Sequence, residues 1–175
     1  MSVEIRAVVL TVSDRCARGE QRDESGPLLA QLLREMGASV LAAVVVADDL
    51  EPLKRKLRGY ADHPEVNLIV TTGGTGLSPR DNTPEATRAV IEREVPGLAE
   101  AMRSETLKLT PMAMISRGVC GVRSGALVVN LPGSPAGVRD CFAVIRPVLG
   151  HAVALVAGRP HEHGPNREGG GKPPS

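Results

Sequence analysis

The sequence predicts an α/β fold, a three-layer α/β/α sandwich in which helices cover both faces of a mostly parallel sheet. Short aliphatic runs recur along the chain, helical patterns separate them, and polar clusters follow several of these runs. Strands that alternate with helices at this spacing form βαβ crossovers and a parallel sheet. An aliphatic run without polar alternation is typical of a strand that is buried on both faces.

Three aliphatic runs in the first half of the chain are the predicted parallel strands, at residues 5–12, 40–46 and 66–70. A polar loop follows the first run. Leucines at helical spacing then predict a helix that starts at 25–27 and ends before Gly37. A second helix is predicted over 50–60, with its leucines facing inward.

The second half of the chain continues this alternation. Thr83 is the predicted N-cap of a helix with Pro84 at its first position, and 96–97 (PG) ends that helix and starts another. The turn residues 123–125 (RSG) separate two apolar segments and predict a hairpin with one antiparallel strand. Ser134 caps a last helix that runs to about residue 157.

The domain boundary is predicted at residue 158. Residues 1–158 form one domain, and residues 159–175 are Gly, Pro and charged residues with nothing to bury. We expect this segment to be a disordered C-terminal tail.

Composition argues against several classes of partner. The formal net charge of +1 leaves no electrostatic footprint for nucleic acid or for an acidic membrane surface. Tyr60 and Phe142 are the only aromatic residues, and stacking of single-stranded bases needs several. We therefore expect neither a nucleic acid nor a membrane as partner.

The cysteines indicate a reducing compartment. Cys16, Cys120 and Cys141 are odd in number and form no CxxC pair, which excludes a zinc ribbon and a disulfide framework. The N-terminus has no signal-peptide pattern, and no apolar run is long enough to span a bilayer. These observations predict a cytoplasmic protein.

Polar clusters follow the predicted strands at the positions where α/β proteins bind ligands. In an open parallel sheet the ligand lies at the carboxyl ends of the strands, near the point where strand order reverses. The clusters are 13–15 (SDR), 48–49 (DD), 71–81 and 130–134 (NLPGS). Their convergence at one edge of the sheet predicts a binding site.

The loop 73–81 (GGTGLSPRD) is the richest of these clusters. Glycines allow several backbone N–H groups to point at one anion, and Arg80 offers a charge-assisted contact. The loop is not a Walker A motif, and Pro79 replaces the third glycine of the dinucleotide fingerprint. Glycine content alone fits a tight structural turn nearly as well as a phosphate site.

Asp48 and Asp81 are candidate magnesium ligands, because Mg²⁺ prefers oxygen ligands and bridges carboxylates to substrate phosphates. Each also fits the N-cap of the helix that follows it, and the two interpretations are compatible. Gly133 and Ser134 lie at a helix start that favours anions, although a plain turn needs the same residues. Arg117, in the pair 116–117 (SR), fits an ion pair with an acidic neighbour.

Taken together, these segments resemble the MoaB/Mog family of molybdenum cofactor biosynthesis proteins, which is related to the G domain of gephyrin. The resemblance covers about residues 4–157. Any one of its motifs can arise by chance, but all of them in this order and spacing are specific. They are 11–15 (TVSDR), 23–27 (DESGP), 46–49 (VADD), 71–76 (TTGGTG), 79–87 (PRDNTPEAT), 96–97 (PG), 116–117 (SR) and 130–135 (NLPGSP).

The resemblance implies a molybdopterin-binding domain-like fold, a homotrimer and molybdopterin adenylyltransferase activity that uses Mg²⁺, with ATP and molybdopterin as substrates. Asp48 and Asp81 are then the catalytic and metal-binding carboxylates, and Ser116 and Asn130 contact the molybdopterin side. The residues expected to bind substrate are Ser13, Asp14, Thr72, Gly73, Gly74, Thr75, Gly76, Arg80, Ser116, Arg117, Asn130, Pro132, Gly133 and Ser134.

Two other functions compete with this one. A non-catalytic MoaB-type protein that binds or delivers molybdopterin keeps the glycine loop but does not need both aspartates. A nucleotide-dependent oxidoreductase is disfavoured by Pro79. Because the sequence has no second large domain, we expect hand-over of the product to a separate metal-insertion protein.

Overall fold

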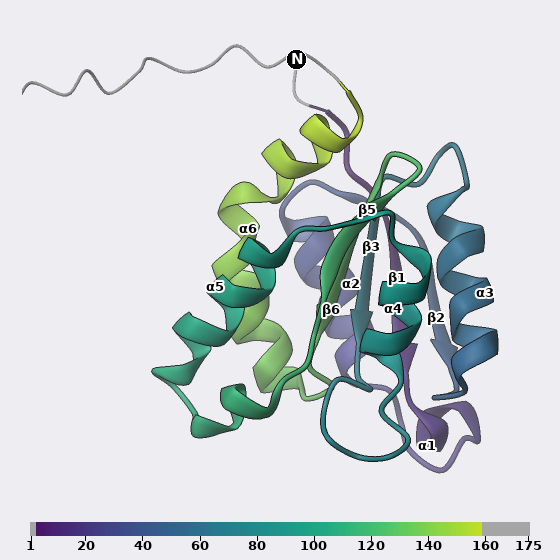
Figure 1. Cartoon of the computed structure of the whole chain (residues 1–175), viewed down its shortest axis with the longest axis vertical. Coiled ribbons are helices and arrows are strands. Elements are labelled where there is room, and N and C mark those ends of the chain that lie inside the picture. The colour runs from purple at the N-terminus through teal and green to yellow at the C-terminus, as the bar shows by residue number, and fades with distance from the viewer. Residues whose placement is uncertain (1–2, 159–175) are drawn as a thin grey trace, which may run out of the picture.

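The structure is a computed structural model that describes residues 3–158. Within this range the strands form one sheet of six with helices on both faces (Figure 1). The strands are β1 Arg6–Val12, β2 Ser39–Val46, β3 Leu68–Thr72, β4 Arg93–Glu94, β5 Cys120–Arg123 and β6 Ala126–Leu131. The predicted tail lies outside the described residues, and the boundary at residue 158 remains a prediction.

The helices lie in two layers, as the two hydrophobic core clusters show. One cluster joins the sheet to α3 and α4, and the other joins it to α2, α5 and α6. The helices are α1 Asp14–Ala17, α2 Ser25–Glu35, α3 Leu50–Ala61, α4 Thr83–Val90, α5 Pro96–Leu107 and α6 Pro135–Val156, with a 3₁₀ helix η1 at Pro111–Ile115.

The sheet has the strand order β2-β1-β3-β6-β5-β4. β2, β1, β3 and β6 are parallel, whereas β5 is antiparallel to both of its neighbours. The predicted fold class is confirmed. From β1 the chain crosses to β2 on one side, and from β3 it continues to β6 on the other. The strand order therefore reverses between β1 and β3, where α/β folds place their ligands.

The aliphatic composition of β1 follows from burial on both faces. Val8 and Leu10 pack in the cluster under α3 and α4, while Ala7 and Val9 pack in the cluster under α2, α5 and α6. All four side chains are fully buried. A central strand of this kind fixes the position of the loop at its carboxyl end.

The expected helix from Thr83 to Pro96 is wrong in its second half, because α4 ends at Val90. The chain then joins the sheet edge as β4, with Glu92 N–H donating to Val122 O and Val95 N–H donating to Cys120 O, each at 2.8 Å. This pairing to a distant strand replaces the helical hydrogen bonds. The sequence analysis predicted neither the short helix α1 nor the 3₁₀ helix η1.

The predicted hairpin is confirmed. Ser124 and Gly125 connect β5 to β6 with φ angles of 48° and 86°. Positive φ at both central residues is the geometry that a tight two-residue hairpin turn requires. In residues 3–158 no helix is both long enough and apolar enough to cross a membrane.

Candidate functional site

The polar loops that follow the four parallel strands meet at one edge of the sheet. β1 ends before Ser13, β2 before Asp48, β3 before Gly73 and β6 before Pro132. In Figure 1 this edge lies at the bottom of the molecule, together with α1 and η1. The convergence predicted from the sequence is present in the structure.

The glycine loop begins with two residues in the left-handed region. Gly73 has a φ of 98° and Gly74 a φ of 66°. Gly73 N–H donates to Leu131 O at 3.1 Å, so the loop starts in contact with the end of β6. A Cβ on Gly73 would collide with the carbonyl oxygen of Val12. The loop therefore begins with a tight turn, which was one of the two interpretations of its glycines, and this turn requires glycine at position 73.

Side chains from three other segments hold this loop in place. Thr72 Oγ1 donates to Pro132 O at 2.8 Å, and Thr83 Oγ1 donates to Gly73 O at 2.9 Å. Arg117 donates to Gly76 O at 2.7 Å and to Asp81 O at 2.9 Å. Because the loop carbonyls are bonded from outside, the loop has a fixed shape before any ligand arrives.

Backbone N–H groups of the loop are free to meet an anion. In the described part of the chain, the N–H groups of Gly74, Thr75 and Gly76 donate no hydrogen bond. The same holds for Gly133 and Ser134 at the start of α6. Several free N–H groups in a loop of this kind, next to a helix N-terminus, form an anion-binding concavity.

Asp48 is the most unusual acid of the site. Its side chain is buried, with 8 % of its surface exposed. Oδ2 accepts a hydrogen bond from Asp14 N–H at 2.9 Å, whereas Oδ1 has no partner among residues 3–158. Burial raises the pKa of Asp48, and the nearby Asp14 and Asp81 charges raise it further. A buried carboxylate oxygen without a partner is costly unless a cation or donor joins it.

Asp81 lies across the glycine turn from Asp48. Its Oδ2 accepts a hydrogen bond from Ser78 N–H at 3.1 Å, and a Cβ on Gly76 would lie 2.8 Å from the same oxygen. A Cβ on Gly74 would lie 2.9 Å from Asp48 Oδ1. The two carboxylates therefore flank one turn, and both line the same cavity. Two carboxylates with an unsatisfied oxygen fit Mg²⁺, which takes its remaining ligands from water and phosphate.

A metal site built from protein ligands alone does not form here. The described residues contain no group of three or more His, Cys, Asp or Glu side chains placed to hold a metal ion.

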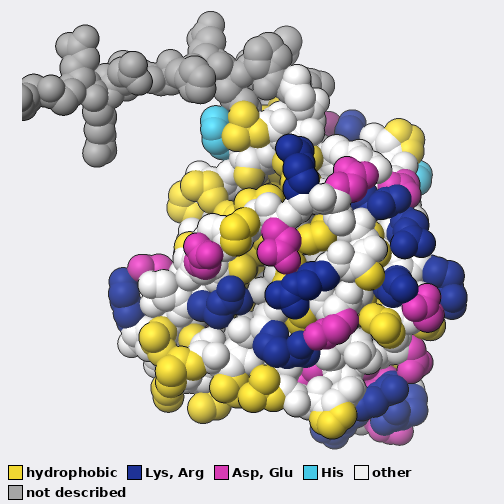
Figure 2. Space-filling view, in the orientation of Figure 1, with side chains coloured by type: hydrophobic (Ala, Val, Ile, Leu, Met, Phe, Trp, Pro, Cys, Tyr) yellow, Lys and Arg dark blue, Asp and Glu magenta, His cyan; other side chains and the backbone are white. Residues whose placement is uncertain are grey.

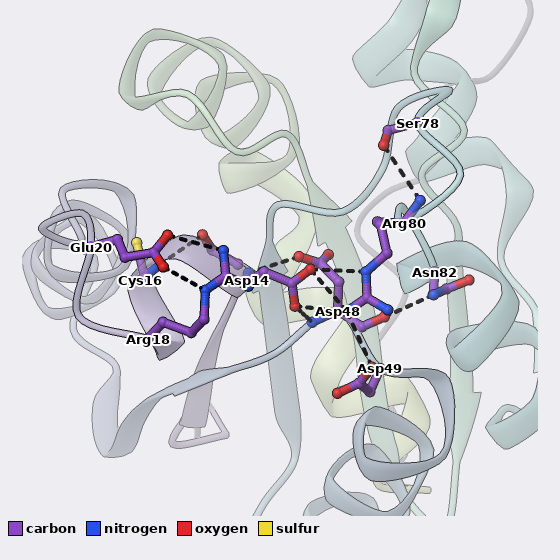
Figure 3. A network of polar contacts seen from close by, with 10 residues as sticks. Asp14, Cys16, Arg18, Glu20, Asp48, Asp49, Ser78, Arg80 and Asn82 are labelled. Carbon is purple, nitrogen blue, oxygen red and sulfur yellow. Dashed lines mark hydrogen bonds and ion pairs between the residues drawn. The ribbon is translucent and has the colours of Figure 1, made fainter.

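Arg80, a predicted phosphate contact, instead pairs with acids of neighbouring loops (Figure 3). Its guanidinium donates twice to the carboxylate of Asp14, each at 2.9 Å, and once to Asp49 at 3.1 Å. Asp14 in turn accepts a hydrogen bond from Asp48 N–H at 3.0 Å. That bond and Arg80 lower the pKa of Asp14. Asp14 and Arg80 thus connect the loops that carry Asp48 and Asp81.

The other predicted substrate residues differ in whether their side chains already form hydrogen bonds within the protein. Ser13 caps α1 by accepting a hydrogen bond from Cys16 N–H at 3.2 Å. Asn130 is buried, and its amide donates to Thr71 Oγ1 and Thr87 Oγ1, each at 3.0 Å. Both donors of that amide are therefore in use. Ser116 and Ser134 line the cavities beside the glycine loop.

Of the four residues that were expected to cap helices, one does so in the structure. Ser134 caps α6 as predicted, by accepting from Gly137 N–H at 3.1 Å. Thr83 is the first residue of α4 and not its N-cap, because its hydroxyl bonds to the glycine loop. Asp48 and Asp81 are not N-caps either, since their carboxylates accept from Asp14 and Ser78. The predicted acidic partner of Arg117 is Glu85.

Three adjoining cavities form a groove along this edge of the sheet. The acidic cavity, of about 270 Å³, contains Asp23, Asp48 and Asp81. The middle cavity, of about 310 Å³, shares Asp81 and Gly133 with it. The apolar cavity, of about 370 Å³, lies between α5, η1 and α6 and shares Met112, Ser116, Pro132 and Ser134 with the middle one.

The sequence analysis did not name some residues of the groove as site residues. Asp23 accepts from Thr11 Oγ1 at 2.7 Å and from Gly26 N–H at 2.9 Å, and so forms one wall of the acidic cavity. Its place in the motif 23–27 (DESGP) and in the polar loop before α2 was the available indication. Arg103 and Asp140 line the apolar cavity. They lie within helices, where a charged residue normally indicates a solvated face.

Cys120 and Cys141 are free and buried, whereas the free Cys16 is half-buried and lines the acidic cavity. Burial raises the pKa of Cys120 to about 12 and that of Cys141 to about 11. Both thiols are therefore protonated at neutral pH and are poor nucleophiles.

Known proteins of molybdenum cofactor biosynthesis match most of this chain. The family model described as "Probable molybdopterin binding domain" matches residues 8–151. The chain is 44 % identical over 149 residues to the molybdenum cofactor synthesis protein cinnamon of Drosophila melanogaster. That match covers 85 % of this chain but only 25 % of cinnamon, so the chain spans about a quarter of that relative's length.

A bacterial relative and a solved structure match over nearly their whole length. The molybdopterin adenylyltransferase of Helicobacter pylori is 38 % identical over 152 residues, which is 86 % of each protein. The crystal structure of the molybdopterin biosynthesis enzyme MoaB from Thermus thermophilus superimposes with a TM-score of 0.84 at 49 % identity. It covers 89 % of this chain and 98 % of that one.

Proposed function

Because the chain belongs to the family of probable molybdopterin-binding domains, we propose that it is a molybdopterin adenylyltransferase of molybdenum cofactor biosynthesis. The observation that carries this proposal is the pair Asp48 and Asp81, which flank the glycine turn in one cavity. Asp48 Oδ1 is buried and has no partner among the described residues, as expected of a ligand for a cation.

The reaction joins two phosphates. An oxygen of the terminal phosphate of molybdopterin attacks the α-phosphorus of ATP, and the bond from that phosphorus to the bridging oxygen breaks. Adenylylated molybdopterin and pyrophosphate are the products. Since both reactants are anions, the main barrier that the protein must lower is their repulsion.

The residues of this chain contribute position and positive potential. Gly74, Thr75 and Gly76, whose N–H groups are free, line the middle cavity, and so do Gly133 and Ser134 at the start of α6. They are suited to hold phosphate oxygens without reorganisation, because the loop is fixed from outside. Asp48 and Asp81 would hold Mg²⁺, which when bound neutralises phosphate charge.

The groove suggests how the two substrates divide the space. We assign the nucleotide to the acidic cavity beside Asp48, the phosphates to the middle cavity and the pterin to the apolar cavity. A flat heterocycle fits an apolar cavity with a few polar groups. This order brings the reacting phosphates next to Asp81, which lines both the acidic and the middle cavities.

No covalent enzyme intermediate is needed. The buried thiols of Cys120 and Cys141 are protonated at neutral pH, so neither is suited to form one. Direct transfer between two bound substrates is the simplest mechanism that this set of residues supports.

Three further features belong to the proposal. We propose a homotrimer, work in the cytoplasm and release of the product to a separate metal-insertion protein. The free cysteines are compatible with the reducing cytoplasm.

The test is a turnover assay with purified protein, molybdopterin, ATP and Mg²⁺, in which pyrophosphate is measured. Asp81→Asn is expected to lower kcat by at least about 100-fold, as loss of one charge-stabilising group does in other active sites. Glu100→Gln, an exposed acid-to-amide change in α5, is the matched control and should keep the wild-type rate. An Asp81→Asn variant with wild-type turnover contradicts the assigned role. Binding of molybdopterin without any pyrophosphate would instead favour a delivery protein.

A further inference from the structure

Two charged side chains of opposite sign line the apolar cavity. It lies between α5, η1 and α6, and apolar residues such as Ala99, Met102 and Leu109 form much of its wall. Arg103 and Asp140 line the same space. Both side chains are half-buried, so each lines the cavity while part of its surface stays exposed.

Neither charge is paired with an opposite charge of the protein. Within residues 3–158, the carboxylate of Asp140 accepts no hydrogen bond and forms no ion pair. Arg103 donates to Gly118 O at 2.9 Å and to Ser116 O at 3.5 Å, and it forms no ion pair in the same range. The two side chains do not pair with each other. The cavity therefore presents a free acceptor and a cationic donor to whatever occupies it.

We propose that Asp140 is the residue that recognises the pterin ring, through the adjacent ring N3–H and 2-amino group on one edge. This inference rests on the proposed function, which supplies the pterin. A carboxylate has two acceptor oxygens that match two adjacent N–H donors, and charge-assisted bonds of this kind are strong. The Arg103 guanidinium supplies the complementary donor for the ring carbonyl.

The position of the cavity agrees with this assignment. Its volume of about 370 Å³ suits a bicyclic ring. It shares Ser116 and Ser134 with the middle cavity, where the free N–H groups of the glycine loop lie. A pterin ring held at Asp140 thus extends its phosphate-bearing side chain toward Asp81.

Such a site predicts selectivity for the 2-amino group. In a lumazine a carbonyl oxygen replaces that group, so one donor is lost and an acceptor faces the carboxylate. A site that places a buried polar group against the ligand rejects an analogue that leaves it unpaired.

The experiment is a fluorescence titration of the full chain with 6-hydroxymethylpterin and 6-hydroxymethyllumazine. Wild-type protein should bind the pterin at least about 10-fold more tightly. Asp140→Asn, which preserves size and removes the charge, should weaken pterin binding about 10- to 100-fold and bring the two affinities within a few-fold of each other. Glu100→Gln, exposed on the neighbouring helix, should behave as wild type. A melting curve confirms that each variant is folded.

Two results overturn the inference: equal binding of both probes by wild type, or a preference for pterin that survives in Asp140→Asn. Pyrophosphate release separates this failure from failure of the proposed function. If Asp140-dependent pterin selectivity is present but molybdopterin and ATP give no pyrophosphate, the transferase proposal fails and the pterin contact stands. If Asp140→Asn turns over with an unchanged KM for molybdopterin, the pterin contact alone is wrong.

Discussion

At the scale of single residues, Asp48 lies in surroundings that oppose its charge. It is buried beside Asp14 and Asp81, and one of its oxygens has no partner among the described residues. Because its pKa in the folded protein is raised, the fold favours the protonated form. Its contribution to stability is present below the unfolded-state pKa and is lost as pH rises through the raised pKa. At neutral pH the site therefore lowers the stability of the domain.

Asp48→Asn is expected to raise stability while abolishing turnover. The amide keeps an acceptor for Asp14 N–H and removes the buried charge, so we expect a gain of about 0.5–2 kcal/mol at pH 7 without Mg²⁺. This gain should vanish as pH falls through the raised pKa, because wild-type Asp48 then becomes neutral too. Urea denaturation at several pH values measures it.

The neighbouring acid supplies the control for this measurement. Asp49 is exposed and forms one surface contact with Arg80, so Asp49→Asn should change stability by less than about 1 kcal/mol at any pH. A destabilised Asp48→Asn, or a gain that does not depend on pH, would show that the Asp48 carboxylate is satisfied in the fold.

A residue's place at a strand end predicts its neighbours, and the structure does bring Asp48 and Asp81 together in one cavity. Their catalytic role stays a prediction. For two other candidate substrate residues the sequence did not predict the partners that the structure shows: Arg80 donates to Asp14, and Asn130 donates to Thr71. Those partners are 66 and 59 residues away in the chain, and no local pattern reveals them. Asp140 was missed because a charged residue inside a helix looks like an ordinary surface position.

At the scale of elements, the glycine loop owes its shape to non-local contacts. Gly73 has a φ of 98° and lies against the carbonyl of Val12, at the end of the neighbouring strand β1. A side chain here meets both backbone strain and a collision with atoms that cannot move. The loop therefore depends on this glycine for its packing against β1 as well as for its turn.

Gly73→Ala is expected to destabilise the domain by about 3 kcal/mol, as the sum of a strained φ and an overpacked contact. Phosphate binding in the middle cavity should weaken as well, because the free N–H groups move with the loop. Gly59→Ala is the matched control, since Gly59 lies in α3 with no atom within 4 Å of its Cβ position. It should stabilise by about 0.5–1 kcal/mol. Similar denaturation midpoints for the two variants would rule out the packing argument.

The elements that the sequence predicted are those with strong local patterns. Buried aliphatic strands and leucine-spaced helices agree with the structure to within a few residues. The hairpin was recognised from its turn residues, and Ser124 and Gly125 have the positive φ that such a turn requires. The edge strand β4 was not, because two residues, Arg93–Glu94, carry no pattern. Pairing with β5, and not local propensity, makes this segment a strand.

At the scale of the whole molecule, the reversal of strand order between β1 and β3 explains why the candidate site lies at one edge of the sheet. Connections leave β1 and β3 in opposite directions, so the loops at their carboxyl ends diverge and leave a groove between the helix layers. The sequence could predict that the polar loops converge at this edge, because they follow the predicted parallel strands. The division of the groove into three cavities depends on side chains from α5, η1 and α6, whose packing the sequence does not specify locally.

The molecular surface bears on the proposed trimer. Large apolar side chains are exposed around η1, among them Leu109, Met112 and Met114, of which Met114 is 68 % exposed. Figure 2 shows hydrophobic side chains gathered at the lower left, where η1 lies in Figure 1. Soluble monomers rarely expose a large contiguous apolar patch, so association between copies of the chain is expected to cover it.

Sedimentation equilibrium should therefore give about three times the chain mass of 18.4 kDa. The melting temperature should rise with protein concentration, because association stabilises the folded chain by mass action. Met114→Glu places a charge on the apolar surface and outside the cavities, so it should lower the sedimentation mass toward one chain while leaving pterin affinity unchanged. A mass of one chain at all concentrations would exclude the trimer. A trimeric Met114→Glu variant would place the contact between copies on another face.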